Sequence, residues 1–262
     1  MARRGSDISV LTGLIIGFGA LLTGFIFERG NVVSLFGLSA LIIILGGTFG
    51  ALVVSFNIRD VLSIFSLVRL AMTPPRSPSQ ELMELLCDYA EKARRDGILS
   101  LEDVIEDVDD DFLKKGMQLV VDGTESDTIA SMLENDIYLY NARRKEEASL
   151  FETAGGFSPT MGIIGTVMGL VLVLSLLSED PKALGHSIAT AFIATLYGIS
   201  FANLVWLPIA NKLKYRAKKE RTQKEMIMAG VLAIQLGENP GLVRRKLESY
   251  ISDEIQSVQS GE

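Results

Sequence analysis

Four stretches of the sequence contain no Asp, Glu, Lys or Arg, and each is long enough to cross a lipid bilayer. Their bounds are Ile8–Phe27, Val32–Phe56, about Gly155–Leu177 and about Ile188–Ile209. A membrane-spanning helix needs roughly 20 predominantly apolar residues. A soluble domain would mix apolar and charged residues at helical or strand periods, whereas this chain keeps them in separate blocks. The sequence therefore predicts four transmembrane helices.

The first stretch follows Arg3 and Arg4, as the apolar core of a secretory signal peptide would. However, it is longer than a typical signal-peptide core, and no small-residue cleavage site follows it. A second apolar stretch also begins within a few residues. We therefore expect the first stretch to be retained as a helix.

Basic residues predict the orientation of the spans. Arg and Lys cluster before the first span, on both sides of the segment between spans two and three, and after the fourth span. The other two loops, Glu28–Asn31 and Ser178 to about Gly185, are short. Because cytoplasmic loops are enriched in Arg and Lys, we predict a multi-pass membrane protein with both termini cytoplasmic.

The segments outside the spans have helical periodicity and no strand-like alternation. We therefore predict an all-α membrane protein with four transmembrane helices, a helical cytoplasmic domain between helices 2 and 3, and a helical cytoplasmic C-terminal tail. The predicted domains are residues 1–56, 57–154, 155–210 and 211–262.

Caps and helix breakers mark boundaries in the predicted cytoplasmic parts. The prolines of Thr73–Ser79 predict a turn, and Gly97 predicts the end of the helix that follows it. The segment Ser100–Asp103 has the pattern of a helix start with Ser100 as N-cap. A long amphipathic helix is predicted from about Ser126 to Phe151, with its continuation into span three left open. Asn239-Pro240 predicts the cap and first turn of a last helix.

The composition argues against several functions. A net charge of −7 disfavours general nucleic-acid binding. The only cysteine, Cys87, excludes an internal disulfide, and the only histidine, His186, lies at a predicted membrane edge, where an interfacial role is favoured over a proton relay. No phosphate-binding glycine loop is present, and the acidic run Glu102–Phe112 lacks the glycine and terminal glutamate of a calcium loop. We expect no enzymatic activity, no cofactor and no resident metal.

The spans lack any carboxylate. Ion carriers place ionisable residues in their membrane segments, where these residues mark the pathway. If this protein works with an ion gradient, a partner must supply the carboxylate. Its own helices would then contribute hydroxyl and backbone oxygens.

Glycine pairs four residues apart favour close helix packing in three spans. They are Gly13 and Gly17, Gly46 and Gly50, and Gly165 and Gly169.

Spans three and four each carry a narrow stripe of small or weakly polar residues with one threonine near its middle. The stripes are Pro159, Gly162, Thr166, Gly169 and Val173 on span three, and Ser187, Ala191, Thr195, Gly198 and Ala202 on span four. One interpretation is an ion path. The other is packing, with each threonine hydroxyl bonded to its own helix. Thr160 lies about 100° from the stripe and has no assigned role.

Pro159 has two interpretations. Ser158 caps the helix and Pro159 occupies its first turn, where a missing N–H costs nothing. Alternatively, the helix begins upstream near Glu152 and Pro159 kinks it at the membrane edge. The sequence does not choose between them.

Several motifs resemble, in the same order, the A subunit of bacterial flagellar stators (the MotA/PomA type), and the likeness covers nearly the whole chain. They are "EKARRDGILSLEDVIED" (Glu91–Asp107), "SPTMGIIGTVMGLV", "AFIATLYGISFANLVWLPIANKL" and "GENPGLVRRKLESYI" (Gly237–Ile251).

The resemblance implies a location in the bacterial inner membrane, a function and partners. Such A subunits form a ring, five around two B chains in known members, and each B chain carries one essential aspartate. Ion flow past that aspartate drives the A ring, whose cytoplasmic domain pushes the switch-ring protein of the flagellar rotor. The transported ion is Na⁺ or H⁺. Besides its protein partners, such a subunit contacts the membrane lipid.

The resemblance also assigns roles to residues. Pro159 and Pro208 match two prolines that couple ion passage to conformational change. Arg94 and Glu102 match a charged pair that contacts the rotor; without the family, they would be assigned to a solvated helix face.

Thr166 and Thr195 match two threonines of sodium-driven members, whereas proton-driven relatives often have alanine at the first position. Sodium is therefore favoured, with proton coupling as the alternative.

Two rival functions remain. One is a proton-channel energiser of outer-membrane processes (the ExbB/TolQ type), although those proteins typically have three spans. The other is a passive membrane scaffold, which predicts that Thr166 and Pro159 tolerate substitution.

Overall fold

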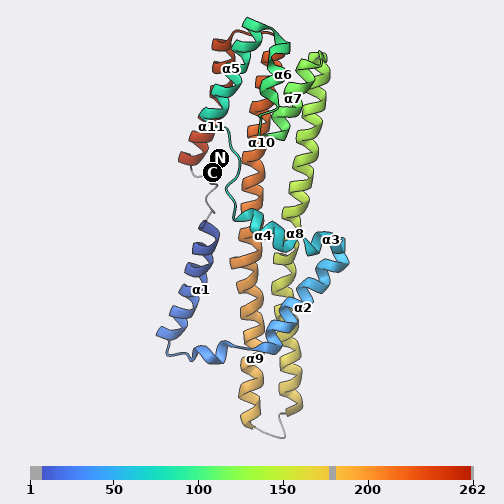
Figure 1. The fold of residues 1–262 in the computed structure, drawn as a ribbon. Helices are drawn as coiled ribbons and strands as arrows, with labels where there is room; N and C mark the ends of the chain where they lie inside the picture. Colours follow the sequence, from blue (N-terminus) through green and yellow to red (C-terminus); the bar gives the residue numbers. More distant parts are fainter. Residues whose placement is uncertain (1–7, 177–180, 261–262) are drawn as a thin grey trace. The chain divides into compact units, whose positions relative to one another are not determined.

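The computed structural model describes residues 8–176 and 181–260, and every regular element in these ranges is helical (Figure 1). Within these ranges, four helical segments are long and apolar enough to cross a membrane. The predicted fold class is thus confirmed. The loop predicted over Ser178 to about Gly185 is shorter than expected, because helix α9 begins at Pro181. Its residues 178–180 and the side chain of His186 lie outside the described residues.

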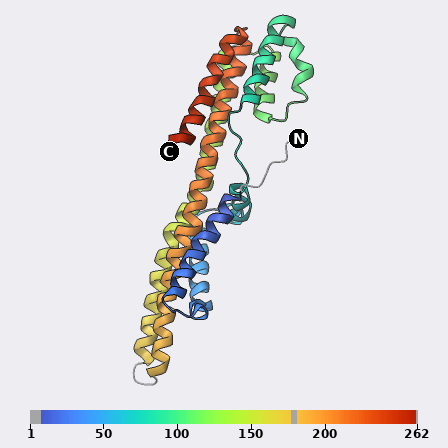
Figure 2. The same cartoon turned by 90° about the vertical axis from the view of Figure 1, so that its left-hand side faces the viewer.

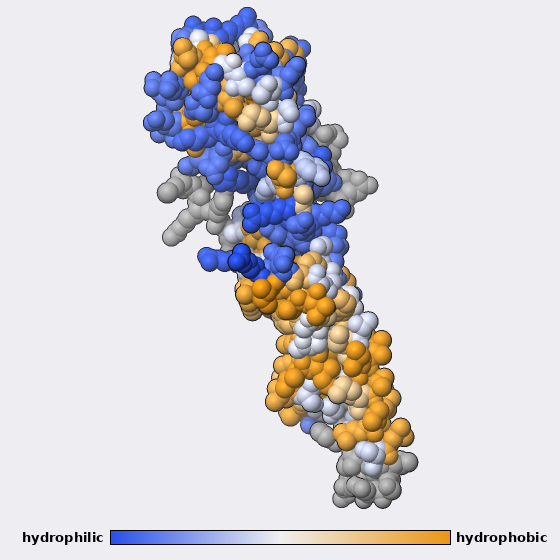
Figure 3. All heavy atoms as spheres, turned by 90° about the vertical axis from the view of Figure 1, so that its right-hand side faces the viewer, coloured by the Kyte–Doolittle hydropathy of each residue, from blue (hydrophilic) through white to orange (hydrophobic). Residues whose placement is uncertain are grey.

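The chain divides into two compact units. Met1–Pro74 and Lys145–Lys214 form one, called the membrane unit below; Pro75–Arg144 and Tyr215–Glu262 form the other, called the polar unit. Figure 3 shows apolar side chains over the surface of the spanning helices and hydrophilic ones over the polar unit. The predicted domains were divided where the membrane spans end, which is a different criterion. The division into two compact units therefore does not test them.

The second span covers Val32–Ser55, close to the predicted bounds, but it is not one continuous helix. Helix α1 covers Ser9–Phe27, but Val32–Leu35 forms a separate 3-10 turn, η1, and helix α2 begins only at Leu38 and ends at Ser55. Tyr197 explains the break, because its hydroxyl donates to the Leu35 carbonyl at 2.6 Å and accepts from the Gly37 N–H at 3.4 Å. These backbone groups are therefore satisfied without a helix.

Two short helices that the sequence analysis did not predict follow α2. They are α3 (Ile58–Leu62) and α4 (Ile64–Ala71). Their apolar faces join a buried cluster of the membrane unit that also contains Phe151 and Trp206. The other buried members are Leu52, Val61, Ile64, Leu67, Ala71, Ala148, Leu150, Ala154, Ile209, Ala210 and Leu213.

Helix α8 runs without interruption over 51 residues, from Ser126 to Leu176. The long amphipathic helix therefore does continue into span three. Pro159 lies inside it, so the interpretation of Pro159 as a helix start is wrong. In the membrane unit, α8 runs beside α9 (Pro181–Phe201) in both views (Figure 1, Figure 2). A π-helical turn, η3 (Ala202–Trp206), joins α9 to α10 (Leu207–Gln235).

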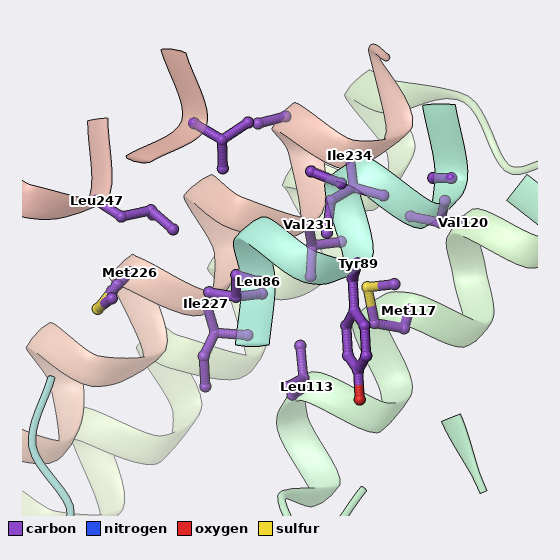
Figure 4. Close-up of a cluster of buried hydrophobic side chains, with 14 of the residues drawn as sticks. Leu86, Tyr89, Leu113, Met117, Val120, Met226, Ile227, Val231, Ile234 and Leu247 are labelled. Atoms are coloured by element: carbon purple, nitrogen blue, oxygen red, sulfur yellow. The ribbon is translucent and has the colours of Figure 1, made fainter. Parts of the chain in front are cut away.

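The polar unit contains α5 (Gln80–Asp96), η2 (Ile98–Leu101), α6 (Glu102–Ile105), α7 (Asp111–Val121), α11 (Pro240–Ser260) and parts of α8 and α10. Leu86, Met117, Ile227 and Leu247 meet in its apolar core (Figure 4). Burying each such side chain contributes about 1.5–3 kcal/mol to folding.

Most predicted helix ends in this unit are confirmed. Gly97 ends α5 with a φ of 88°, a conformation that glycine adopts without strain. Asn239 caps α11, since its side chain accepts from the Gly241 N–H at 2.9 Å. Ser100 is not an N-cap, which corrects the prediction. Its hydroxyl donates back to the Gly97 carbonyl at 2.6 Å because the segment is a 3-10 turn, and the following helix starts without a side-chain cap.

Candidate functional site

The two predicted stripes face each other where α8 packs against α9. A Cβ added to Gly169 would lie 2.6 Å from the Ala191 Cβ, and one added to Gly162 would lie 3.1 Å from the Ala194 carbonyl oxygen. The missing side chains let the two backbones approach closely. The structure therefore brings together residues that the sequence placed on two separate helix faces.

The glycine pairs of the other spans behave differently. A Cβ on Gly17 would lie 2.8 Å from Leu204, but Gly46 and Gly50 have no neighbour within 4 Å among the described residues. On α2 it is Gly47 that packs closely, with Met161 of α8. The pair on span two therefore serves no contact within the described part of the chain.

Thr166 and Thr195 meet at the edge of the α8–α9 contact, and their hydroxyl oxygens are hydrogen-bonded to each other. The Thr166 hydroxyl also lies 3.1 Å from the Gly162 carbonyl and 3.0 Å from the Ala191 carbonyl. The Thr195 hydroxyl lies 3.4 Å from the same Gly162 carbonyl. Each hydroxyl has one proton, so it donates to one acceptor at a time and keeps lone pairs for a cation.

The resulting cluster has four neutral oxygens, from two hydroxyls and two backbone carbonyls. Such oxygens replace the hydration shell of alkali cations in channels and transporters. The bond from Thr166 to Gly162 is also the back-bonding that a packing role predicts. The geometry is thus compatible with both interpretations, and the ion-path roles of the two threonines remain predictions.

Exposed apolar side chains flank the threonine pair on both helices. Ile163 and Leu170, one turn from Thr166, are 59% and 45% exposed. Phe192 and Ile199, one turn from Thr195, are 66% and 49% exposed. The two hydroxyls therefore lie beside an uncharged apolar face that nothing in the described chain covers.

Pro159 lies in the interior of α8, seven residues before Thr166. Its ring leaves the Gly155 carbonyl without the usual N–H donor four residues later. At Gly155 the helix packs closely against the start of α10, where an added Cβ would lie 2.7 Å from Leu207. Thr160, whose role was open, has an exposed hydroxyl that donates to the Phe157 carbonyl at 2.7 Å.

Pro208 is the second residue of α10, two positions after the π turn ends at Trp206. It lines a groove of about 280 Å³ formed by one face of α1 and the residues around the π turn. The lining residues are Ser9, Val10, Gly13, Leu14, Asn203, Leu204, Pro208, Ile209 and Lys212. The sequence analysis did not predict the π turn; the available signal was a proline inside an otherwise continuous helical pattern.

A half-buried polar cluster in the polar unit was also not predicted. Lys224 lies 4.3 Å from the ring centre of Phe112 and 4.9 Å from that of Tyr140, and burial lowers the pKa of its amine. Burial and a hydrogen bond to Glu220 raise the pKa of Tyr140 to about 12. At neutral pH the cluster therefore holds a phenol that donates to a carboxylate, which stabilises the packing of α8 on α10.

Comparisons with known proteins identify the family. Residues 11–97 match the profile of the motility protein A N-terminal region, and residues 104–226 match that of the MotA/TolQ/ExbB proton channel family. Motility protein A of Bacillus subtilis is 34% identical over 98% of this chain and 96% of its own length. The chain belongs to the motility protein A family.

Solved structures agree with this motility protein A assignment. The structure of C. jejuni MotAB contains a chain that superposes with a TM-score of 0.88 at 29% identity, covering 93% of this chain and 95% of that one. A chain of the Bacillus subtilis flagellar MotAB stator complex gives 0.86 at 35% identity, covering 92% and 95%. The resemblance to this family and the predicted fold class are thereby confirmed.

The predicted rotor-contact residues of this motility protein A homologue flank a turn. Arg94 lies in the last turn of α5, and Glu102 is the first residue of α6. Both are exposed, and neither makes a hydrogen bond or ion pair within the described ranges, whereas the neighbouring Arg95 pairs with Asp96 at 2.9 Å. Their charges are therefore available to a partner, although their role remains a prediction.

Proposed function

We propose that this protein is the A subunit of an ion-driven flagellar stator. It spans the inner membrane four times with both termini cytoplasmic, surrounds a B-subunit pair as a ring of five, and converts cation flow into torque on the rotor. The similarity to the MotAB complexes over more than nine tenths of the chain supports this function.

The feature that carries the proposal is the charge-free pair of spans around Thr166 and Thr195. An ion path through the membrane needs a group that binds or exchanges the cation, and such groups are normally ionisable. The spans of this chain offer only hydroxyl and carbonyl oxygens, beside an exposed apolar face. A helix of the B subunit that brings one carboxylate to that face would complete the site.

Sodium is the favoured ion. A dehydrated sodium ion needs several oxygen ligands, and the threonine cluster provides neutral ones that add to one carboxylate. A proton needs only the carboxylate, so proton transport would leave the second hydroxyl without a purpose in conduction. The name of the wider family, which refers to proton channels, keeps H⁺ as the alternative.

The remaining roles follow from position. Pro159 lies in α8 with Thr166, and Pro208 lies in α10, which follows α9 and the π turn. Each proline lacks a backbone N–H, so both positions are suited to bend when the ion passes. Arg94 and Glu102 offer opposite charges on an exposed turn, which suits contact with the charged switch-ring protein of the rotor.

The sodium dependence of swimming tests the proposal. Cells that lack their own A subunit would be complemented with the wild-type chain and its B subunit, with Thr166→Ala, or with Thr160→Ala. We expect Thr166→Ala to raise the sodium concentration for half-maximal speed at least fivefold, because it removes one ligand and the contact to Thr195. Thr160→Ala removes an exposed, back-bonded hydroxyl and serves as the matched control.

The outcomes separate the alternatives. If wild-type complementation restores no swimming at any sodium concentration or pH, the stator function is wrong. If Thr166→Ala swims as wild type at every sodium concentration, the sodium site is wrong and proton coupling is favoured. If Pro159→Leu swims normally, Pro159 has no coupling role.

A further inference from the structure

Helix α1 contacts the segment formed by η3 and α10 at two points and leaves a groove between them. At one point Gly17 packs on the Leu204 side chain, which an added Cβ would meet at 2.8 Å. At the other point the Lys212 ammonium donates to the Ser9 hydroxyl at 3.1 Å. The two points are eight residues apart on each segment, which is about 12 Å along a helix. The groove of about 280 Å³ lies along this stretch.

The groove is open because one of its walls carries no side chain at its middle. Gly13 lies midway between Ser9 and Gly17, and an added Cβ there would meet no described atom within 4 Å. Pro208, midway between Leu204 and Lys212, lines the other wall. The described chain therefore leaves space between the helices at this level.

The chemistry of the groove differs between its middle and one end. Val10, Leu14 and Ile209 make the middle apolar, and the amide of Asn203 donates to the Ile199 carbonyl at 2.9 Å. None of the described lining residues is acidic, and Lys212 supplies a cation at one end. Because both walls belong to membrane-spanning segments, hydrocarbon rather than water is the natural filling of the apolar part.

Lys212 lies at the depth of lipid phosphate groups. It is the first basic residue after the fourth apolar stretch, three positions beyond Ile209. In the proposed orientation this end of the groove lies in the cytoplasmic leaflet, which contains anionic lipids, and basic sites between spans on that side bind lipid headgroups. An ammonium and a phosphate oxygen form a charge-assisted hydrogen bond, which is stronger than a neutral one.

We propose that this groove binds one anionic phospholipid. Its phosphate lies against Lys212 and Ser9, and one acyl chain passes Gly13 between α1 and α10. Helix α1 has no buried residue within the described chain, so the bound lipid would add apolar contacts that hold α1 on the membrane unit. This site goes beyond the proposed function, since it uses the proposed orientation of the spans but neither ion flow nor torque.

Lipid titration of the purified full-length protein in detergent tests the headgroup. Native mass spectrometry counts the bound phosphatidylglycerol, with phosphatidylcholine of the same acyl chains as the uncharged comparison. We expect tighter binding of phosphatidylglycerol, and Lys212→Gln should weaken it about fivefold, which corresponds to the loss of one basic residue near an anionic headgroup. Lys212→Arg should bind as wild type. The matched control is Lys214→Gln, because Lys214 pairs with Glu152 and does not line the groove.

A second pair of variants tests the acyl chain. Gly13→Leu places a side chain in the groove and should lower the binding of both lipids. Gly24→Leu, at another position on α1 where an added Cβ meets no described atom within 4 Å, should bind both as wild type. Glycerol phosphate, which has the phosphate but no acyl chain, should not displace phosphatidylglycerol at equal concentration.

The outcomes decide between occupants. Equal binding of the two lipids, or unchanged binding in Lys212→Gln, overturns the inference. Displacement by glycerol phosphate means that the site takes a free phosphate ester and also overturns it. If Gly13→Leu changes the oligomeric mass but not lipid binding, the groove holds a second copy of the chain and the lipid site is wrong. If Gly13→Leu does not fold, the comparison of Lys212→Gln with Lys212→Arg decides. None of these measurements uses swimming or ion flux, so a failure of the stator function would leave them unchanged.

Discussion

Gly198→Ala tests the contact on which the candidate site depends. The added methyl group would lie 2.6 Å from the Ser158 carbonyl oxygen and 3.1 Å from the Gly162 Cα. Both are backbone atoms, so no side chain can rotate away to make room. The α8 and α9 helices must separate instead.

The structure sets the size of the effect. Restoring an ordinary contact of 3.4 Å requires about 0.8 Å of separation. That movement takes the Ser158–Gly198 bond, now 3.0 Å, out of hydrogen-bond range. Overpacking costs about 1–3 kcal/mol and the lost bond about 1 kcal/mol, which together amount to roughly 2–4 kcal/mol.

Thermal unfolding of the purified A–B complex measures this cost. For a chain of this size each kcal/mol lowers the midpoint by about 2–4 °C, so we expect a decrease of at least roughly 4 °C. Gly46→Ala is the matched control, because its added methyl group meets no atom within 4 Å in the described chain. If Gly198→Ala unfolds at the wild-type midpoint, the close packing of the two stripes is wrong.

Two further predictions concern the polar unit. Arg94→Glu is expected to slow swimming severalfold without lowering the stability of the complex, because the Arg94 side chain has no partner in the described chain. The control Arg95→Glu loses only the contact with Asp96 and is expected to swim normally. Equal effects of the two substitutions on swimming would contradict a rotor contact at Arg94. Tyr140 keeps its proton up to about pH 12 in the folded state but loses it near pH 10 when unfolded, so its contribution to the free energy of unfolding falls as pH rises from 10 to about 12. Tyr140→Phe should remove that part of the pH dependence, which denaturant titration at several pH values measures. If the free energy of unfolding of Tyr140→Phe changes with pH as in wild type, the raised pKa of Tyr140 is wrong.

The number of spans, the all-α class and the two small-residue stripes follow from the sequence alone. They depend on composition and on the helical period, which are local properties that tertiary contacts do not reverse. The end of α5 and the start of α11 were predictable for the same reason. Gly97 ends α5 through its own backbone conformation, and Asn239 caps α11 with its own side chain.

Tertiary structure decided the features that depend on distant residues. Whether Pro159 starts or kinks a helix depends on the apolar surface around Phe151 and Ala154, whose burial extends α8 upstream. The hydroxyl of Ser158 was free by sequence to cap its own helix, but it donates to Gly198, 40 residues away.

The break before α2 has a similar origin, since Tyr197 binds the backbone at Leu35 from 162 residues away. The last residue of the π turn, Trp206, likewise packs on Phe49 of α2 and Phe151 of α8, both distant in the sequence. A local pattern shows which backbone groups a segment has, but only the packed chain determines which partners reach them.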